Sequence, residues 1–306
     1  MIPIYLITGF LGAGKTTFLK NFIRTMPPCR MHIIVNEFGR EGIDGTLLKE
    51  IGAVVDEINN GSIFCSCRLD KFEEVLEKAI AGGPEMIIIE ASGLSNPGNV
   101  RKILADERFK AIDYKGSICL VDAVRFPKVY ETAVVCKKQL GICDAVILNK
   151  TDIADRCQIE ETKRLILSQR PDVSIYETSF GKIDSSWLHR LHSPHKAEDD
   201  NTVQTQDITL RSRIVEISPE MSLKSLEKFI AMFIENTYRI KGFVRLEGRT
   251  YHVDCVGTFL SIKPYDGEIT AENRLVVLST SSLHMQKSLK EAAKWYDGLV
   301  KICMMP

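Results

Sequence analysis

A glycine-rich segment near the N-terminus carries the clearest chemistry in this 306-residue chain. Residues 9–17 read Gly-Phe-Leu-Gly-Ala-Gly-Lys-Thr-Thr and follow the apolar run 4–7. Glycines at this spacing let successive backbone N–H groups surround a phosphate at the start of a helix, where the helix dipole favours negative charge. Apolar residues recur at helical spacing over 18–23, so the strand, loop and helix of a P-loop are all present. The segment therefore predicts a nucleotide-binding site.

Six consecutive residues are expected to contact the phosphates: Gly12, Ala13, Gly14, Lys15, Thr16 and Thr17. The Lys15 ammonium would reach the β- and γ-phosphates, and the Thr16 hydroxyl would bind Mg²⁺. Glu90 ends the apolar strand 86–89, where a Walker B carboxylate holds Mg²⁺. Gly93 follows, and its N–H can approach the γ-phosphate closely because it has no side chain. Lys15, Thr16 and Glu90 are thus predicted to be catalytic.

The segment 149–152, Asn-Lys-Thr-Asp, indicates which base is bound. It follows the apolar run 145–148, at the carboxyl end of a predicted strand, where open α/β sheets place their ligands. The Asp152 carboxylate can accept hydrogen bonds from the ring N–H and the exocyclic amine of guanine, a pair of donors that adenine lacks. Asn149, Lys150 and Ser179 are also assigned to the nucleotide site. GTP is therefore the expected nucleotide, and an ATP-dependent small-molecule kinase is the alternative if 149–152 is an accidental turn.

Five segments resemble those of the CobW-type GTP-binding metallochaperones, which are related to the nickel-insertion GTPases of urease and hydrogenase maturation. They lie in this order along the chain: 8–17, 35–44, 90–97, 149–152 and 238–244. The resemblance implies GTP binding, slow hydrolysis to GDP, and a nucleotide-controlled delivery of metal or metallocofactor to a client enzyme. It makes 35–44 a switch segment and adds Glu37 to the catalytic residues. A GTP-dependent homodimer is a further expectation.

The chain departs from this family in the metal motif. Members carry Asn-Gly-Cys-x-Cys-Cys, whereas residues 60–67 read Asn-Gly-Ser-Ile-Phe-Cys-Ser-Cys. Cys65 matches the last family cysteine and Cys67 is an additional thiol, so the two offer soft ligands for Zn, Co or Ni. The remaining ligands would come from Glu37 or Glu41, from histidines elsewhere, from a second protomer or from the client protein. Alternatively, both cysteines are buried thiols. The protein would then be a GTP-gated chaperone of a cofactor-dependent enzyme, for example a corrinoid enzyme, that binds no transition metal itself.

A second set of metal-binding side chains, His189, His192 and His195, falls in a polar stretch. These histidines either gather metal ions or belong to a solvated spacer, and the spacer is the simpler interpretation. Asp122 ends another apolar strand, and it would lie near the nucleotide or cap the helix that follows.

Composition limits the partners and the compartment. The 40 basic and 40 acidic residues balance, so neither nucleic acid nor an anionic membrane is an expected partner. Nine scattered cysteines favour a reducing cytoplasm over a disulfide framework. The longest apolar runs are shorter than the roughly 18 residues of a membrane span, so no span is expected. The N-terminus lacks a basic segment and its apolar run belongs to the first predicted strand, so no signal peptide is expected.

Alternation of strand and helix patterns predicts the fold. Strands are expected at 5–8, 32–36, 53–58, 86–90, 117–122, 145–149 and 174–177, and helices at 16–25, 69–80 and 158–168. This alternation is typical of an α/β protein with a doubly wound, mostly parallel sheet, here a P-loop NTPase domain over 1–187. A polar linker is expected over 188–207. The remainder, 208–306, predicts a smaller α+β domain with strands at 208–217, 241–246, 250–264 and 274–279 and helices at 222–233 and 281–295.

Overall fold

The structure is a computed structural model in which two compact units, Met1–Gln206 and Asp207–Pro306, are described separately. It describes residues 1–35, 53–57, 69–93, 97–188, 210–267, 269, 272–280 and 283–304.

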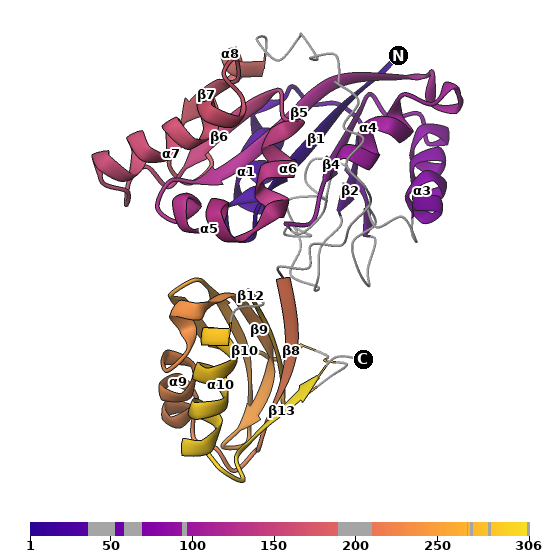
Figure 1. The fold of residues 1–306 in the computed structure, drawn as a ribbon. Helices are drawn as coiled ribbons and strands as arrows, with labels where there is room; N and C mark the ends of the chain where they lie inside the picture. Colours follow the sequence, from indigo (N-terminus) through magenta and orange to yellow (C-terminus); the bar gives the residue numbers. More distant parts are fainter. Residues whose placement is uncertain are drawn as a thin grey trace. The chain divides into compact units, whose positions relative to one another are not determined.

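The first unit is built on a seven-stranded sheet in which every pair of neighbouring strands is parallel (Figure 1). The order is β3-β2-β4-β1-β5-β6-β7. The strands are β1 (Ile2–Gly9), β2 (Met31–Val35), β3 (Val54–Glu57), β4 (Met86–Glu90), β5 (Ile112–Asp122), β6 (Ala145–Asn149) and β7 (Ser174–Glu177). All seven predicted strands are therefore confirmed, and the sheet is parallel throughout.

Both faces of this sheet are buried, because successive residues of β1 enter different cores. Tyr5 and Ile7 pack with α1 (Lys15–Thr25), and α8 (Ser185–Leu188) adds to the same core. Ile4 and Leu6 pack on the other face with α3 (Leu69–Ala81) and α4 (Gly98–Leu104). A strand buried on both sides reads as a continuous apolar run, and this is why the central strands were recognisable in the sequence.

The remaining helices connect the later strands. They are the 3₁₀ helix η1 (Glu107–Phe109), α5 (Phe126–Thr132), α6 (Val134–Gly141) and α7 (Arg156–Gln169). A capping box starts α7: the Asp155 carboxylate accepts from the Gln158 N–H, and the Gln158 side chain accepts from the Asp155 N–H.

β1 and β5 are both longer than predicted, and β1 begins at Ile2 rather than at residue 5. β5 begins at Ile112 rather than at residue 117, and Ile112 pairs with Ile2 at the start of β1. The sequence obscured this extension because Asp113, Lys115 and Gly116 interrupt the apolar pattern. Gly116 has a φ of 129°, which residues with a side chain rarely adopt.

The second unit is a six-stranded antiparallel sheet of order β11-β10-β9-β12-β8-β13. Its strands are β8 (Leu210–Ile217), β9 (Thr237–Leu246), β10 (Arg249–Val256), β11 (Phe259–Pro264), β12 (Arg274–Thr280) and β13 (Val300–Met304). The helices α9 (Leu223–Ala231) and α10 (Leu283–Trp295) contribute apolar side chains to one core with the sheet, and a short 3₁₀ turn, η2 (Ile234–Asn236), follows α9. The predicted helix 222–233 therefore ends earlier than expected, and β13 was not predicted.

The segment 238–244 lies in β9, where its glycine has a steric role. A Cβ at Gly242 would collide with the Arg274 backbone carbonyl of β12, so the close approach of the two strands requires glycine. Arg239, two strand positions before Lys241, has its guanidinium 3.5 Å from the Asp254 carboxylate on β10. Phe229 and Phe233 pack in the core of this unit, as expected, and Tyr238 is also buried.

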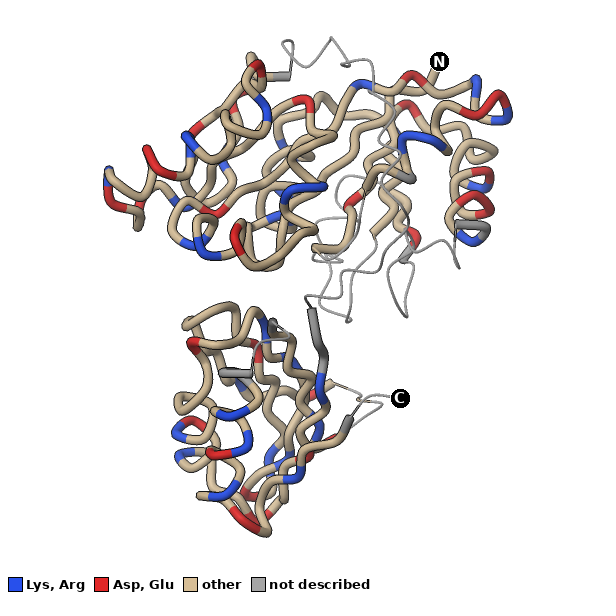
Figure 2. The backbone as a smooth tube through the Cα atoms, viewed as in Figure 1, with Lys and Arg blue, Asp and Glu red and all other residues tan. Residues whose placement is uncertain are grey.

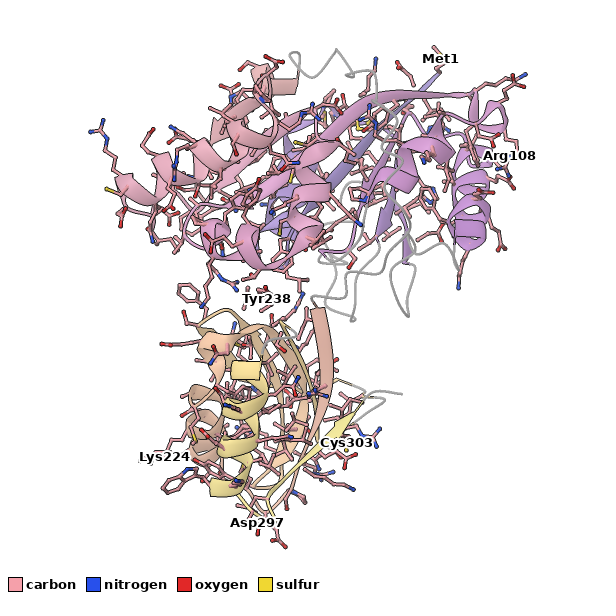
Figure 3. The ribbon with its side chains drawn as sticks, in the orientation of Figure 1. Met1, Arg108, Lys224, Tyr238, Asp297 and Cys303 are labelled. Atoms are coloured by element: carbon pink, nitrogen blue, oxygen red, sulfur yellow. The ribbon has the colours of Figure 1, made fainter. Side chains whose placement is uncertain are left out.

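Charges of both signs are mixed along α3 and α7 (Figure 2). One ionic cluster joins η1 to α3: Arg108, labelled in Figure 3, lies 2.8 Å from the Glu73 carboxylate and 3.1 Å from that of Asp106. These side chains are partly exposed, so solvent screens each pair and its contribution to stability is small. Within the described part of the chain, the helices are too short or too polar to cross a membrane.

Candidate functional site

The predicted nucleotide-binding residues gather at one edge of the parallel sheet. The P-loop follows β1, Glu90 ends β4, Asp122 ends β5, and Asn149 ends β6. These strands are neighbours in the order β4-β1-β5-β6, and their carboxyl ends lie at the same edge. Segments that are distant in the sequence therefore meet there.

The P-loop turns sharply into α1. Gly12 and Gly14 have φ angles of 75° and 98°, and Gly14 is the N-cap of the helix. The Lys15 ammonium lies across the loop and donates to the carbonyls of Gly9 at 2.9 Å and Phe10 at 3.3 Å. The helix N-terminus and this cation are the two elements that the motif needs for an anion.

Thr16 and Glu90 form the oxygen-rich part of the site. The Thr16 hydroxyl donates to a Glu90 carboxylate oxygen at 3.3 Å, and only 2% of Glu90 is exposed. The parallel pairing of β1 with β4, which sets Ile7 beside Glu90, produces this proximity. A buried carboxylate beside a hydroxyl is an all-oxygen donor set, which is the chemistry that Mg²⁺ prefers. The two residues thus fit the predicted metal.

Gly93 lies directly against the P-loop. A Cβ at this position would come within 2.7 Å of the Leu11 backbone nitrogen, so a side chain cannot be accommodated without movement. The structure therefore brings Gly93 to the loop on which a γ-phosphate is expected.

Asn149 connects the P-loop to the loop after β7. Its side-chain nitrogen Nδ2 donates to the Ala13 carbonyl at 2.9 Å, and its Oδ1 accepts from the Gly181 N–H at 3.0 Å. Asn21 of α1 holds the same loop by donating to the Phe180 carbonyl at 2.9 Å. Phe180 has a φ of 57° and is 65% exposed, so the backbone here is held in the left-handed conformation by its surroundings.

The 149–152 and 178–182 segments are also joined directly. The Thr151 hydroxyl lies 3.1 Å from the Ser179 hydroxyl and donates to the Thr178 carbonyl at 3.0 Å. Asp152 is exposed next to this junction. The Asp152 carboxylate is therefore accessible to a ligand beside this loop.

Lys150, in the segment that follows β6, forms an ion pair with Asp122 at the end of β5. The Lys150 ammonium lies 2.6 Å from Asp122 Oδ2, and 23% and 9% of the two side chains are exposed. Asp122 Oδ1 accepts from the N–H groups of Val124 at 3.0 Å and Arg125 at 3.1 Å. Arg125, not Asp122, is the N-cap of α5, so Asp122 fixes the turn before the helix and orients Lys150.

Three buried cysteines lie near the site: Cys119, Cys136 and Cys143. A hydrogen bond with the Cys143 thiol, together with burial, raises the pKa of the Cys119 thiol well above its ordinary value. A thiol that remains protonated is a poor metal ligand and a poor nucleophile. The residues with described positions contain no cluster of three or more side chains suited to holding a metal ion.

The predicted transition-metal site lies outside the described residues. This applies to Glu37, Glu41, Cys65 and Cys67, and to the three histidines of 189–195.

Gln139 of α6 was missed by the sequence analysis. Its side chain is buried and donates to the Gly93 carbonyl at 3.2 Å. The available signal was a polar residue on the face that α6 buries, among Val135, Cys136 and Leu140.

The first unit has the P-loop GTPase fold. Its parallel sheet carries a P-loop at the carboxyl edge, with the Asn-Lys-Thr-Asp segment beside it. The model of the CobW/HypB/UreG nucleotide-binding domain matches residues 3–177, and that of the cobalamin synthesis protein cobW C-terminal domain matches 210–293. The chain therefore belongs to the CobW/HypB/UreG family.

Among curated relatives, the zinc chaperone YjiA of Escherichia coli is 30% identical over 196 residues, which cover 61% of this chain and 60% of that protein. The chain thus matches less than two thirds of that relative's length. The zinc chaperone CobW of Sinorhizobium is 28% identical over 297 residues, covering 81% of this chain and 82% of that one. The crystal structure of Zn(II)-bound YjiA GTPase from E. coli is 21% identical, covers 97% of this chain and 98% of that chain, and has a TM-score of 0.49.

Proposed function

We propose that this protein is a GTP-binding switch that slowly hydrolyses GTP and assists the delivery of a metal or metallocofactor to a client enzyme. The observation that carries the proposal is the single connected site at the sheet edge. There Asn149 joins the P-loop to the loop beside Asp152, and Thr16, the residue after Lys15, contacts Glu90.

Guanine selectivity is assigned to Asp152. Its exposed carboxylate can accept two hydrogen bonds from guanine. The neighbouring segments are held together by the contacts of Thr151 with Ser179 and of Asn149 with Gly181. Gly12, Ala13, Gly14 and Thr17 complete the phosphate-binding loop and the first turn of α1.

Hydrolysis would proceed by attack of water on the γ-phosphorus in line with the bond to the β–γ bridging oxygen, giving GDP and phosphate. Lys15 and the P-loop N–H groups would stabilise the charge that develops on the phosphate oxygens. Mg²⁺, held by Thr16 and Glu90, would neutralise part of the phosphate charge when bound. Glu37 of the proposed switch segment is the further candidate for the hydrolytic step.

Metal handling is proposed from the relatives and from the sequence. The relatives are named as zinc chaperones, and Cys65, Cys67 and Glu37 offer thiolate and carboxylate ligands. A site with few protein ligands suits an ion that must be released to a client. The partner would be a metalloenzyme or cofactor-dependent enzyme, and a GTP-dependent homodimer would complete the switch.

The nucleotide part is tested by Lys15→Ala, with Lys20→Ala in the same helix as the matched control. We expect Lys15→Ala to abolish GTP binding and hydrolysis, because the cation that reaches the phosphates is lost, while Lys20→Ala behaves as wild type. Retention of tight GTP binding by Lys15→Ala would refute the assignment.

The metal part is tested by titrating reduced protein with Zn(II), Co(II) and Ni(II), with and without a non-hydrolysable GTP analogue. We expect binding that shifts with nucleotide and is lost in a Cys65→Ser/Cys67→Ser variant, but not in Cys157→Ser, which removes an exposed thiol elsewhere. Binding indifferent to these thiols and to nucleotide would contradict metal delivery and favour a GTP-gated chaperone that carries no transition metal.

A further inference from the structure

We propose that Gln139 is a positioning residue that holds Gly93 for the γ-phosphate and couples α6 to the nucleotide state. The inference rests on the proposed GTP function and adds a residue to it. It concerns the part of the site that distinguishes GTP from GDP.

Gly93 is fixed between two neighbours. On one side its Cα faces the Leu11 backbone of the P-loop so closely that a Cβ would lie 2.7 Å from the Leu11 nitrogen. Its carbonyl accepts a hydrogen bond of 3.2 Å from Gln139 Nε2. The Gly93 N–H and carbonyl lie in adjacent peptide planes that rotate about φ and ψ, so the carbonyl bond restricts the N–H direction only together with the packing of the Cα against Leu11.

The Gln139 side chain is buried, so water does not compete for its hydrogen bond to Gly93. It is 1% exposed, on the face of α6 that packs into the unit. A buried glutamine must satisfy its amide within the protein, so exchanging the bond to Gly93 for water is costly. The hydrogen bond is therefore a specific tether between elements 46 residues apart in the chain.

A second contact links the same two regions. Arg101 of α4, the helix that follows Gly93, donates through Nη1 to the Ile142 carbonyl, the residue directly after α6, at 3.3 Å. The end of α6 thus contacts the chain on both sides of residues 94–96. Any displacement of Gly93 relative to α6 must alter one of these two bonds.

α6 also borders the P-loop. Gln139 and Cys136 line a small pocket together with Phe10, Leu11 and Asp122. The helix is therefore in a position to respond when nucleotide contacts reorganise the loop. Since GTP has a γ-phosphate and GDP has none, only GTP can use a correctly directed Gly93 N–H, and the tether should favour the GTP state selectively.

The test compares affinities for GDP and for a non-hydrolysable GTP analogue, both with Mg²⁺, in wild type, Gln139→Met and Thr162→Val. Methionine preserves the side-chain length but removes the donor. Thr162→Val removes another buried hydrogen bond, 3.1 Å from the Thr162 hydroxyl to the Ala123 carbonyl, away from Gly93. We expect Gln139→Met to lower the affinity for the GTP analogue about tenfold, the loss expected for one buried hydrogen bond. Its affinity for GDP should fall less than about twofold.

Hydrogen exchange on the wild-type protein provides a second measurement that does not depend on variant folding. We expect the amides of 134–143 to exchange more slowly with the GTP analogue than with GDP. Equal losses for both nucleotides in Gln139→Met, unchanged affinities, or identical exchange in 134–143 would overturn the role of Gln139 while the GTP function stands. Failure of the wild type to bind either guanine nucleotide would overturn the proposed function itself.

Discussion

Asn149, at the end of β6, donates a hydrogen bond of 2.9 Å to the carbonyl of Ala13 in the P-loop. Through its other side-chain atom it also accepts from the Gly181 N–H. The phosphate-binding loop and the proposed base-binding loops are thereby joined through one buried side chain, of which 2% is exposed. Asn149 thus bridges the two loops directly.

Asn149→Ala should lower the free energy of unfolding by about 1–3 kcal/mol, because the Ala13 carbonyl and the Gly181 N–H lose a buried partner. GTP and GDP should both bind more weakly, since both use the same loops. Chemical denaturation and nucleotide titration measure the two effects. Asn21→Ala, which removes more exposed bonds to the same loop, should have a smaller effect. An Asn149→Ala variant as stable as the wild type would contradict the bridging role.

Gly93→Ala should impair the GTP state strongly. The new methyl group would lie 2.7 Å from the Leu11 nitrogen, and overpacking of this kind costs about 1–3 kcal/mol. Gly141→Ala, at the end of α6, is the control because a Cβ there would meet no atom of the described structure within 4 Å. Thermal unfolding and GTP-analogue affinity should change only for Gly93→Ala; equal behaviour of the two variants would show that Gly93 tolerates a side chain.

Asp122→Asn should weaken nucleotide binding and destabilise the first unit. The change leaves the partly buried Lys150 ammonium without its carboxylate, at a cost of about 1–3 kcal/mol, less than for a fully buried pair. Asp113→Asn breaks the more exposed pair with Lys115, also 2.6 Å, and should destabilise the protein much less because solvent screens this pair. Denaturation of Asp122→Asn, of Lys150→Met and of the double variant would give the coupling energy, and a coupling near zero would refute the role of this pair.

The free energy of unfolding should fall at acidic pH, in part because the Asp56 carboxylate becomes protonated. Partial burial disfavours its charge, but hydrogen bonds from Lys78 at 3.1 Å and His32 at 3.0 Å outweigh burial and lower the pKa of Asp56. A carboxyl whose pKa is lower in the folded state stabilises the protein above its unfolded pKa of about 4 and loses that contribution as pH falls through the folded value. Asp56→Asn should therefore flatten the decline of the free energy of unfolding below about pH 4. A decline as steep as that of the wild type would count against this contribution.

Contiguous motifs were predictable from the sequence because their chemistry is local. Gly14 and Lys15 are adjacent, and Glu90 ends an apolar run, so strand order was not needed to recognise them. Asn149 was assigned to the nucleotide, but its bridge to Gly181 depends on how β6, β7 and α1 pack.

The role of Gln139 and the extension of β5 could not be predicted, because both depend on how elements distant in the sequence pack together. The role of Gln139 arises from the approach of α6 to Gly93, and a single glutamine in a short helix gives no periodic signal of that approach. Ile112 joins the sheet because β1 offers it a partner, despite the polar residues that follow. Both features depend on tertiary contacts.

The most direct test of guanine recognition is a competition measurement in which GTP and ATP displace a labelled GDP from wild type and from Asp152→Asn. The account predicts that GTP competes at least about 100-fold better than ATP in the wild type, as two hydrogen bonds to a charged acceptor would provide, and that Asp152→Asn loses most of this preference. Equal competition by ATP and GTP in the wild type would contradict the account.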